Sequence, residues 1–432
     1  MTGARAVVDP KRWQAAVAAH DLPAFDPTDA ERVVVVAAHP DDETLGAGPV
    51  LRALVAAGAR AAVVVATDGE AAYPGLDAAA RRELGAQRRT ELDAALRAQG
   101  LGDLDVEWLG LPDSDLAGHV GELTAALRPL LAGADLCLAP WSGDPHPDHQ
   151  AAGAATRAAA PVTAHCWSYP IWMWPWTEPD GPGVPWGRAH AVSVDGAERR
   201  VRRAAVDCFI SQLRPGPDGS PPVLAEGQLD HLDRDTDLLF REPPTASAPI
   251  ARFRELYAGG RDPWDSGSWY EQRKRAAVLA LLPRRRYRSA VEPGCGAGEL
   301  TVELAGRCDL LRSSEPVPEA AAAARARTRA LANVEVTEAA LPGAIGTDPV
   351  DLVVVSEVLY YLDDATVAAT LDRVAEVLEP GGDVVAVHWR GWPPEAPRDA
   401  MATHRMLAAH PALEQVVVLV DEEFVLCVLR RR

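Results

Sequence analysis

Three features that are common in exported and membrane proteins are scarce or missing in this sequence. No apolar run approaches the ~20 residues that a helix needs to cross a bilayer. The stretch Met1–Asp21 carries Asp9 and alternating polar residues where a signal peptide has an unbroken apolar region. The six cysteines are scattered and none forms a CxxC pair, so neither a disulfide framework nor a cysteine zinc site is indicated. We therefore expect a cytoplasmic protein.

Positive charge is also in short supply. The chain has 43 Lys and Arg residues against 62 Asp and Glu residues, for a formal net charge of −19. A surface with this balance repels nucleic acid and anionic membranes, so we expect neither as a partner. The sequence does not indicate an oligomeric state.

The chain of 432 residues is too long for one ordinary domain. Short apolar runs alternate with Ala-rich helical segments, which predicts α/β domains with mostly parallel sheets. The Pro-rich stretch Glu242–Pro249 interrupts this pattern and separates two such series. The expected strands before it are Val33–Ala38, Ala61–Ala66 and Leu136–Ala139. Those after it are Ala290–Pro293, Leu310–Ser314, Asp351–Ser356, Val384–His388 and a closing hairpin of Gln415–Val420 with Phe424–Leu429. We predict two domains, 1–245 and 250–432.

Two clusters of histidine and aspartate follow strands of the first series. The motif Ala-His-Pro-Asp-Asp-Glu (residues 38–43) comes directly after the first strand, and His-Pro-Asp-His (residues 146–149) comes after Leu136–Ala139. Ligands bind beyond the carboxyl ends of strands in open α/β sheets, so both clusters stand where a site is expected. Three protein ligands with an open position define a catalytic zinc site, and His39, Asp42 and His149 supply such a set. Asp41 and His146 then remain free for proton transfer.

These two motifs together resemble the PIG-L (LmbE-like) deacetylases over roughly residues 30–245. The resemblance implies a Rossmann-like fold and removal of N-acyl groups from small amino sugars and related glycosides by a Zn²⁺ enzyme. It assigns His39, Asp42 and His149 to the metal and makes Asp41 the general base. His146 is the oxyanion-stabilising or general-acid histidine, expected to be cationic, and Asp148 is expected to orient it. Supporting matches are Arg88–Glu91 on a helix, Gly110–Asp113 and Ser211–Gln212.

A tryptophan-rich stretch follows the second motif. Its tryptophans are Trp167, Trp172, Trp174, Trp176 and Trp186, and interspersed prolines argue against a helix or a central strand. The sequence leaves two interpretations open, a packed loop or a wall of the substrate pocket.

A glycine-rich loop follows the first strand of the second series. Glu292-Pro-Gly-Cys-Gly-Ala-Gly298 precedes the expected helix Glu299–Ala305, and glycines allow sharp turns and close approach to a ligand. Glu315 closes the next strand, about 20 residues later, where a carboxylate can bind ribose hydroxyls. The dinucleotide alternative requires GxGxxG, and the third glycine stands at the wrong place for it.

This region resembles the class I methyltransferases, and more narrowly the nodulation-type N-methyltransferases, over roughly residues 250–432. The narrower resemblance depends on Asp262–Trp264, Ser268–Arg273 and Ser356–Leu362. It implies a second Rossmann-like fold and S-adenosylmethionine as cofactor. The residues it assigns to the cofactor are Glu292, Gly294, Gly296, Gly298, Glu315 and Glu357, with Trp269, Tyr270 and Arg273 closing over it. Many relatives place an aspartate near the adenine, whereas this chain has Ala339-Ala340-Leu341.

The methyl acceptor is expected after the fourth and fifth strands of this series. Glu357, Tyr360, His388 and Arg390 occupy these positions, although His388 is equally well interpreted as a structural strand-end histidine. Together the two resemblances predict a bifunctional enzyme that deacetylates an N-acetylated, glycoside-like small molecule and methylates the exposed amine. Two alternatives stay open: methylation of a sugar hydroxyl, or a C-terminal domain that only binds S-adenosylmethionine.

Overall fold

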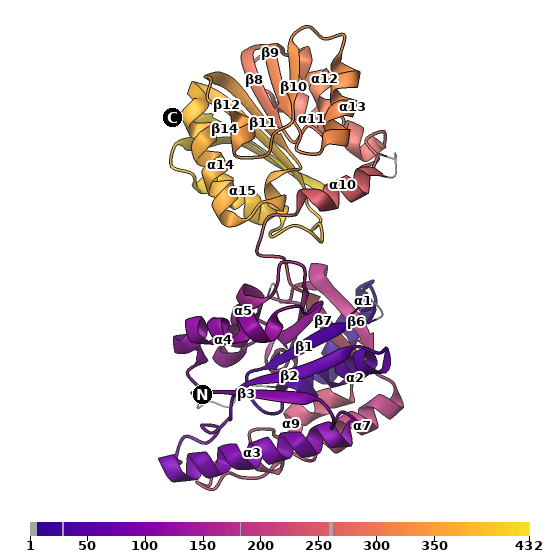
Figure 1. The fold of residues 1–432 in the computed structure, drawn as a ribbon, viewed down its shortest axis with the longest axis vertical. Coiled ribbons are helices and arrows are strands. Elements are labelled where there is room, and N and C mark those ends of the chain that lie inside the picture. Colours follow the sequence, from indigo (N-terminus) through magenta and orange to yellow (C-terminus); the bar gives the residue numbers. More distant parts are fainter. Residues whose placement is uncertain (1–6, 28–29, 182, 259–261) are drawn as a thin grey trace. The chain divides into compact units, whose positions relative to one another are not determined.

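The computed structural model describes residues 7–27, 30–181, 183–258 and 262–432. The chain divides into two compact units, Met1–Glu242 and Pro243–Arg432, whose limits differ by a few residues from the boundaries 1–245 and 250–432 proposed from the sequence. Each unit is a seven-stranded mixed sheet with helices on both faces, so the predicted fold class of two α/β domains is confirmed (Figure 1). No helix in the described part of the chain is long and apolar enough to cross a membrane.

The N-terminal sheet has the strand order β3-β2-β1-β4-β5-β7-β6. Its first five strands along the chain run parallel, and β7 pairs antiparallel with both β5 and β6. The strands are β1 (Arg32–Ala37), β2 (Arg60–Thr67), β3 (Asp105–Leu111), β4 (Leu136–Pro140), β5 (His165–Tyr169), β6 (Ala189–Ser193) and β7 (Thr236–Arg241). The helices are α1 (Pro10–Ala19), α2 (Gly48–Ala56), α3 (Ala78–Ala98), α4 (Val120–Leu131), α5 (Pro147–Ala159), α6 (Met173–Trp176), α7 (Gly196–Val206), α8 (Ile210–Leu213) and α9 (Glu226–Leu229).

Side chains that point alternately to the two faces of β1 divide the N-terminal core into two layers. Val33 and Val35 pack in one cluster with α2, α3 and α7, whereas Val34 and Val36 pack in the other with α4 and α5. Successive side chains of a strand point to opposite faces, so a strand apolar at every position is buried on both sides. The unbroken run of valines therefore makes β1 the centre of the sheet and fixes where its carboxyl end emerges.

The C-terminal sheet has the order β10-β9-β8-β11-β12-β14-β13, with β14 antiparallel to both β12 and β13. The strands are β8 (Tyr287–Pro293), β9 (Cys308–Ser314), β10 (Val334–Thr337), β11 (Val350–Ser356), β12 (Leu378–Trp389), β13 (Leu413–Val420) and β14 (Phe424–Arg431). The helices are α10 (Ile250–Ala258), α11 (Trp269–Leu281), α12 (Glu299–Ala305), α13 (Pro318–Thr328), α14 (Asp364–Val377) and α15 (Ala400–Ala409).

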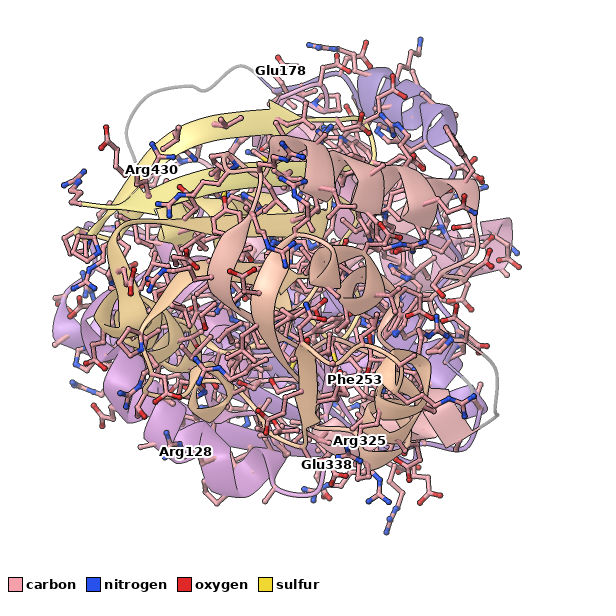
Figure 2. The ribbon with its side chains drawn as sticks, turned by 90° about the horizontal axis from the view of Figure 1, so that it is seen from above. Arg128, Glu178, Phe253, Arg325, Glu338 and Arg430 are labelled. Carbon is pink, nitrogen blue, oxygen red and sulfur yellow. The ribbon has the colours of Figure 1, made fainter. Side chains whose placement is uncertain are left out.

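Side chains that point alternately to the two faces of β11 divide the C-terminal core in the same way. Val353 and Val355 pack with α14 and α15, whereas Leu352 and Val354 pack with α11 and α12. Charged side chains lie at the surface, for example Arg325 of α13, which pairs with Glu338 at 2.9 Å (Figure 2).

Candidate functional site

The two histidine–aspartate motifs of the N-terminal unit meet at the carboxyl ends of neighbouring parallel strands. The first lies between β1 and the π-helical turn η1 (Glu43–Ala47), which continues into α2. The second begins α5, where His146 is the N-cap and Pro147 takes the first helical position, which suits its fixed φ and missing N–H. Because β1 pairs directly with β4, the two motifs are brought together by the sheet.

The three residues predicted to bind metal are buried and adjacent. Asp42 Oδ1 lies 3.1 Å from His149 Nε2, and Asp42 Oδ2 lies 3.5 Å from His39 Nδ1. The same carboxylate accepts the backbone N–H groups of Ala38 and His39 at 2.9 and 2.8 Å, which fixes its orientation. The structure therefore places Asp42 in contact with both His39 and His149. The groups whose donor atoms all lie within 4.8 Å of one another are His39 with His146 and His149, and His39 with Asp113 and Asp148.

Asp144, which the sequence reasoning missed, orients His149. Its Oδ1 lies 3.0 Å from His149 Nδ1, and its Oδ2 accepts the backbone N–H groups of Ile171 and Met173. An ionised carboxylate only accepts hydrogen bonds, so in the neutral ring Nδ1 carries the hydrogen and Nε2 keeps its lone pair. His149 Nε2 is buried and faces Asp42 Oδ1 at 3.1 Å, as is expected of two atoms that share a metal. The only signal in the sequence was that Asp144 begins the run Asp-Pro-His-Pro-Asp-His.

The charges around these donors also fit a cation. Burial opposes protonation of His149, yet Asp42 and Asp144 raise its pKa to about 9. Burial likewise opposes protonation of His39, whose pKa is nevertheless raised well above its usual value by Asp42, Asp113 and Asp148. Surroundings that hold protons on two buried imidazoles favour positive charge, which a divalent ion bound to the same nitrogens would supply.

Another histidine, His146, lies close enough to compete for a ligand position. Donor atoms of His39, His146 and His149 all lie within 4.8 Å of one another. However, His146 Nδ1 accepts the N–H of Asp148 at 3.2 Å, so the neutral ring carries its hydrogen on Nε2. Burial, together with His39 and His149, lowers the pKa of His146 to about 4, so the ring is neutral near pH 7 and not cationic as expected.

Asp148 also differs from its expected role. Its side chain lies 3.2 Å from His39 Nε2 and accepts the N–H of Ser114 at 2.8 Å, so it orients His39 and not His146. Asp113 reaches the same His39 nitrogen at 3.3 Å. The contact of Asp148 with His146 is made by its backbone N–H alone.

Asp41 stands beside the ligand set without joining it. Its carboxylate pairs with Arg88 of α3 at 3.0 Å, and both side chains are almost fully buried. Burial raises the pKa of Asp41 to about 6, although Arg88 works in the opposite direction. A pKa near neutrality suits a group that takes up and releases a proton.

The tryptophan-rich stretch is packed, but the expectation that it holds no helix or central strand is wrong: Trp167 lies on β5, an interior strand of the sheet, and Trp174 and Trp176 lie on the short helix α6. Trp174 is buried, its ring centroid lies 5.0 Å from that of Trp13, and its Nε1 donates to Pro170 O. Trp172 and Trp176 stack with ring centroids 4.4 Å apart. These contacts favour the packing interpretation over a sugar-binding wall.

The C-terminal unit has a cavity of about 890 Å³ at the carboxyl ends of its parallel strands. Gly294 and Gly296 line it, and Gly296 has a φ of 55°, which a residue with a side chain rarely adopts. Gly298 does not line the cavity. It has a φ of 87°, and a Cβ there would lie 3.2 Å from Ala324, so this glycine allows α12 to approach α13.

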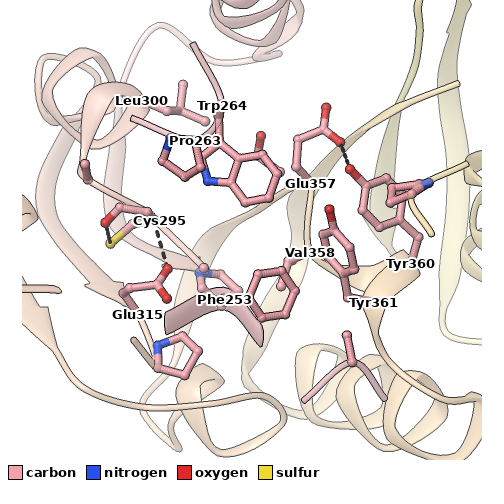
Figure 3. A pocket seen from close by; sticks show the side chains of 18 of the residues that line it. Phe253, Pro263, Trp264, Cys295, Leu300, Glu315, Glu357, Val358, Tyr360 and Tyr361 are labelled. Carbon is pink, nitrogen blue, oxygen red and sulfur yellow. Dashed lines mark hydrogen bonds between the residues drawn. The ribbon is translucent and has the colours of Figure 1, made fainter. Parts of the chain in front are cut away.

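Glu315 and Glu292 hold the glycine loop and its neighbouring strand. Glu315 accepts the N–H groups of Gly296 and Val317, both at 3.0 Å (Figure 3). Glu292 accepts the hydroxyls of Thr301 and Ser313, and burial raises its pKa to about 7. Both glutamates line the cavity, as expected of residues that contact the cofactor.

Two residues expected to close over the cofactor do not line the cavity. Trp269 is 76% exposed, and Arg273 pairs with Asp421 and lies over the ring of Phe424. Tyr270, from the same helix, does line it. The aromatic cover comes instead from Phe253 and Tyr257 of α10 and from Trp264, whose Nε1 donates to Tyr257 at 2.9 Å (Figure 3).

The residues proposed for the acceptor separate into two groups. Glu357 and Tyr360 line the cavity, whereas His388 and Arg390 are absent from its described lining. Both ring nitrogens of the buried His388 are in use, because Nε2 accepts the N–H of Leu359 at 3.3 Å and Nδ1 lies 3.1 Å from His404 Nε2. The structural interpretation of His388 is therefore favoured.

The stretch Ala339–Leu341, where the sequence has no aspartate, faces the cavity. The loop after β10 contributes Ala339, Ala340 and Leu341 to the cavity wall.

Comparisons with known proteins agree with both units. Residues 34–160 match the family described as PIG-L, GlcNAc-PI de-N-acetylase, and residues 252–427 match the family Nodulation protein S (NodS). A deacetylase of 1D-myo-inositol 2-acetamido-2-deoxy-α-D-glucopyranoside from Thermobifida fusca is 30% identical over 231 residues, covering 46% of this chain and 74% of that protein.

Two relatives of the C-terminal unit are nodulation proteins. Nodulation protein S of Rhizobium tropici is 36% identical over 135 residues, which cover 31% of this chain and only 56% of that protein. The crystal structure of the N-methyltransferase NodS from Bradyrhizobium japonicum WM9, in complex with S-adenosyl-L-homocysteine, is 25% identical, with a TM-score of 0.37, and the match covers 42% of this chain and 97% of that one. This chain therefore belongs to the PIG-L deacetylase family through its N-terminal domain, and its C-terminal domain is similar to the NodS methyltransferases.

Proposed function

We propose that this protein removes the acetyl group from an N-acetylated amino-sugar glycoside and then methylates the amine that has been exposed. The observation that carries the proposal is the arrangement of Asp41, a buried carboxylate held by Arg88, beside the donors His39, Asp42 and His149. Relatives named as deacetylases of a 2-acetamido-2-deoxy-glucopyranoside support this substrate class.

His39, Asp42 and His149 would hold a Zn²⁺ ion, which when bound supplies an activated water and a polarised acetyl carbonyl. Asp144 fixes the tautomer of His149, and Asp148 with Asp113 orients His39. Asp41 takes the proton from the attacking water. Arg88 holds Asp41 in place at 3.0 Å.

His146 stabilises the oxygen that becomes negative during hydrolysis. Its neutral ring presents an Nε2–H donor because Nδ1 is engaged with the N–H of Asp148. A preorganised donor in a buried site stabilises developing charge without requiring a full positive charge of its own. His146 therefore acts as a hydrogen-bond donor, and Asp41 passes the proton that it took from the water to the departing amine.

The C-terminal cavity would hold S-adenosylmethionine, which supplies an electrophilic methyl group on a sulfonium. Gly294 and Gly296 allow close backbone approach, and Glu292 and Glu315 line the same wall. The aromatic side chains of Phe253, Tyr257 and Trp264 cover the cavity, and aromatic faces attract cations such as a sulfonium.

The order of the two reactions follows from the nucleophile. An amide nitrogen shares its lone pair with the carbonyl and attacks a methyl donor poorly, whereas a free amine attacks well. Deacetylation therefore creates the acceptor that the second domain requires. Both reactions on one chain raise the effective concentration of the intermediate only where the product can reach the second site.

Mass spectrometry of the reaction products tests the proposal. Purified protein loaded with zinc is incubated with N-acetylglucosaminyl-inositol and S-adenosylmethionine. We expect one product that has lost the acetyl group and gained a methyl group. A product that is only deacetylated would contradict the methyltransferase half, and unchanged substrate would contradict the deacetylase half for this glycoside.

A further inference from the structure

A buried lysine joins two carboxylates on the wall of the C-terminal cavity. Lys274 of α11 has a side chain that is 4% exposed, and its Nζ lies 2.6 Å from Glu271 and 2.7 Å from Glu357. It also lies 4.8 Å from the centre of the Tyr270 ring. All four residues line the cavity, so this group faces the ligand space and is not merely core.

Glu357 is held in a backbone conformation that a side chain rarely adopts. Its φ is 56°, a left-handed value that is strained for a residue with a side chain and persists only where the surroundings hold it. Those surroundings are Lys274 on Oε1, and the Tyr360 hydroxyl and the Trp389 N–H on Oε2. Figure 3 shows the Glu357 carboxylate and the Tyr360 hydroxyl joined at one side of the cavity, with Glu315 at the other.

The charges of this group do not balance. Two carboxylates share one ammonium, and burying an uncompensated charge is costly. Each carboxylate has an oxygen that can accept a further hydrogen bond. Among the described residues, Glu357 Oε1 accepts only from Lys274, and Glu271 uses only one of its oxygens for the same lysine. The surrounding cavity is also acidic, because the carboxylates in its lining outnumber the cations Lys274 and Arg275.

We propose that Glu357 and Glu271 form the subsite that binds the amine of the methyl acceptor, and that Lys274 is a positioning residue that holds both carboxylates apart in the correct orientation. A substrate ammonium would balance the charge of the second carboxylate, and a neutral amine would donate its N–H groups to the same two carboxylates. The subsite selects a free amine over an amide, and it repels acceptors that carry phosphate or carboxylate near the reacting nitrogen. This inference rests on the proposed methyl transfer for the identity of its ligand.

Binding of a simple amine tests the subsite without the cofactor. Glucosamine is titrated into the full-length protein in a calorimeter, with N-acetylglucosamine as the matched probe in which the charge is removed. The Glu357→Gln variant is compared with Glu379→Gln, which makes the same change in a surface ion pair with Arg288. All three proteins also carry Asp41→Asn, so that the N-terminal site does not convert N-acetylglucosamine into glucosamine. That site is then identical in all three, and a difference between them reports on the C-terminal subsite.

We expect Glu357→Gln to weaken glucosamine binding in the C-terminal domain roughly 10- to 100-fold, because a hydrogen bond to a charged group is lost. Glu379→Gln should change it by less than about threefold. The affinity for N-acetylglucosamine should not change in either variant. If Glu357→Gln unfolds the domain, as a lowered Tm would show, Glu271→Gln is used in the same titration.

The role of Lys274 is tested by a change of charge and its rescue. Lys274→Met should raise the KM for glucosamine in the methylation assay more than it lowers kcat, and Lys274→Arg should restore most of the affinity because it keeps the cation. Equal glucosamine affinity in wild type and in both Glu357→Gln and Glu271→Gln would overturn the subsite. Binding that depends on Glu357 without any methyl transfer would support the subsite and contradict the proposed function instead.

Discussion

The two domains share one strand order and differ in the loop that follows the first strand. Counted from the first strand of each sheet, the order is 3-2-1-4-5-7-6 in both. In each, the site lies where strands one and four emerge side by side, at the point where the strand order reverses. The chemistry therefore depends on the loop, which is His-Pro-Asp-Asp in the first domain and Pro-Gly-Cys-Gly-Ala-Gly in the second.

That difference decides how each site uses its carboxylates. In the N-terminal site the side chains of the loop fill the space, and Asp42 contacts two histidines and two backbone N–H groups. In the C-terminal site the glycines leave a cavity of about 890 Å³, and carboxylates such as Glu315 and Glu357 stand on its walls. The first arrangement suits a small ion, whereas the second suits organic cations.

Removing a ligand should separate the two sites most sharply. We expect the Asp42→Ala and His149→Ala variants to lose the bound metal. Their deacetylase activity should fall by more than about 100-fold, because removing a residue that only orients a metal ligand already costs up to about 100-fold. The rise in Tm caused by S-adenosylmethionine should not change. Elemental analysis and calorimetric scans measure both, and unchanged metal content in both variants would contradict the assignment.

Asp41→Asn should break catalysis while leaving the metal in place. A general base contributes typically about 10²- to 10⁴-fold, so a loss in that range is expected. A base must be ionised to act, and the pKa of Asp41 is about 6. The kcat/KM of the wild type should therefore fall as the pH drops below about 6, and the variant should lack this decline. Loss of metal from the variant would mean that Asp41 and Asp42 exchange roles.

Asp144→Asn tests the residue that the sequence did not reveal. The amide can no longer hold the hydrogen on His149 Nδ1 by charge, so we expect a loss in metal affinity of about 10- to 100-fold with the fold intact. A metal titration against a competing chelator measures it. Asp135→Asn is a suitable control, since Asp135 accepts backbone N–H groups at the other end of β1. Equal affinities in the two variants would remove Asp144 from the site.

Glu315→Ala should weaken the C-terminal site alone. The variant loses the hydrogen bonds to Gly296 and Val317 that hold the glycine loop, and with them a carboxylate on the cavity wall. We expect about tenfold weaker binding of S-adenosylmethionine, seen as a smaller rise in Tm at equal ligand concentration. Deacetylase activity should not change. A variant whose Tm rises as much as that of the wild type would argue against a cofactor role.

The smallest effect is expected at Trp269. Its side chain is 76% exposed and does not line the cavity, so Trp269→Ala should change the affinity for S-adenosylmethionine by less than about twofold. Trp264→Ala is the matched change inside the cavity and should have the larger effect. The opposite ranking in a calorimetric titration would restore the role that the sequence indicated for Trp269.

Local motifs were predictable because adjacent residues carry them. The motif of residues 38–43 after β1, the motif of residues 146–149 at the start of α5 and the glycine loop each concentrate their chemistry within a few positions. Trp269 and Arg273 were expected to close over the cofactor but do not line the cavity, for a different reason. Tyr270, Lys274 and Val278 recur every four residues of α11 and form the face that lines the cavity. Trp269 and Arg273 therefore lie on another face of the helix. Lys274 was missed because its partner Glu357, directly after β11, is far away in the sequence and no local pattern connects the two residues.

The most direct test of the account follows the methyl group onto its atom. The Asp41→Asn variant receives S-adenosylmethionine with a ¹³C-labelled methyl group, together with either N-acetylglucosaminyl-inositol or the free amine glucosaminyl-inositol. We predict a ¹³C-methyl signal on nitrogen with the free amine and no transfer to the acetylated compound. Equal methylation of both compounds, or a methyl group on oxygen, would contradict deacetylation followed by N-methylation.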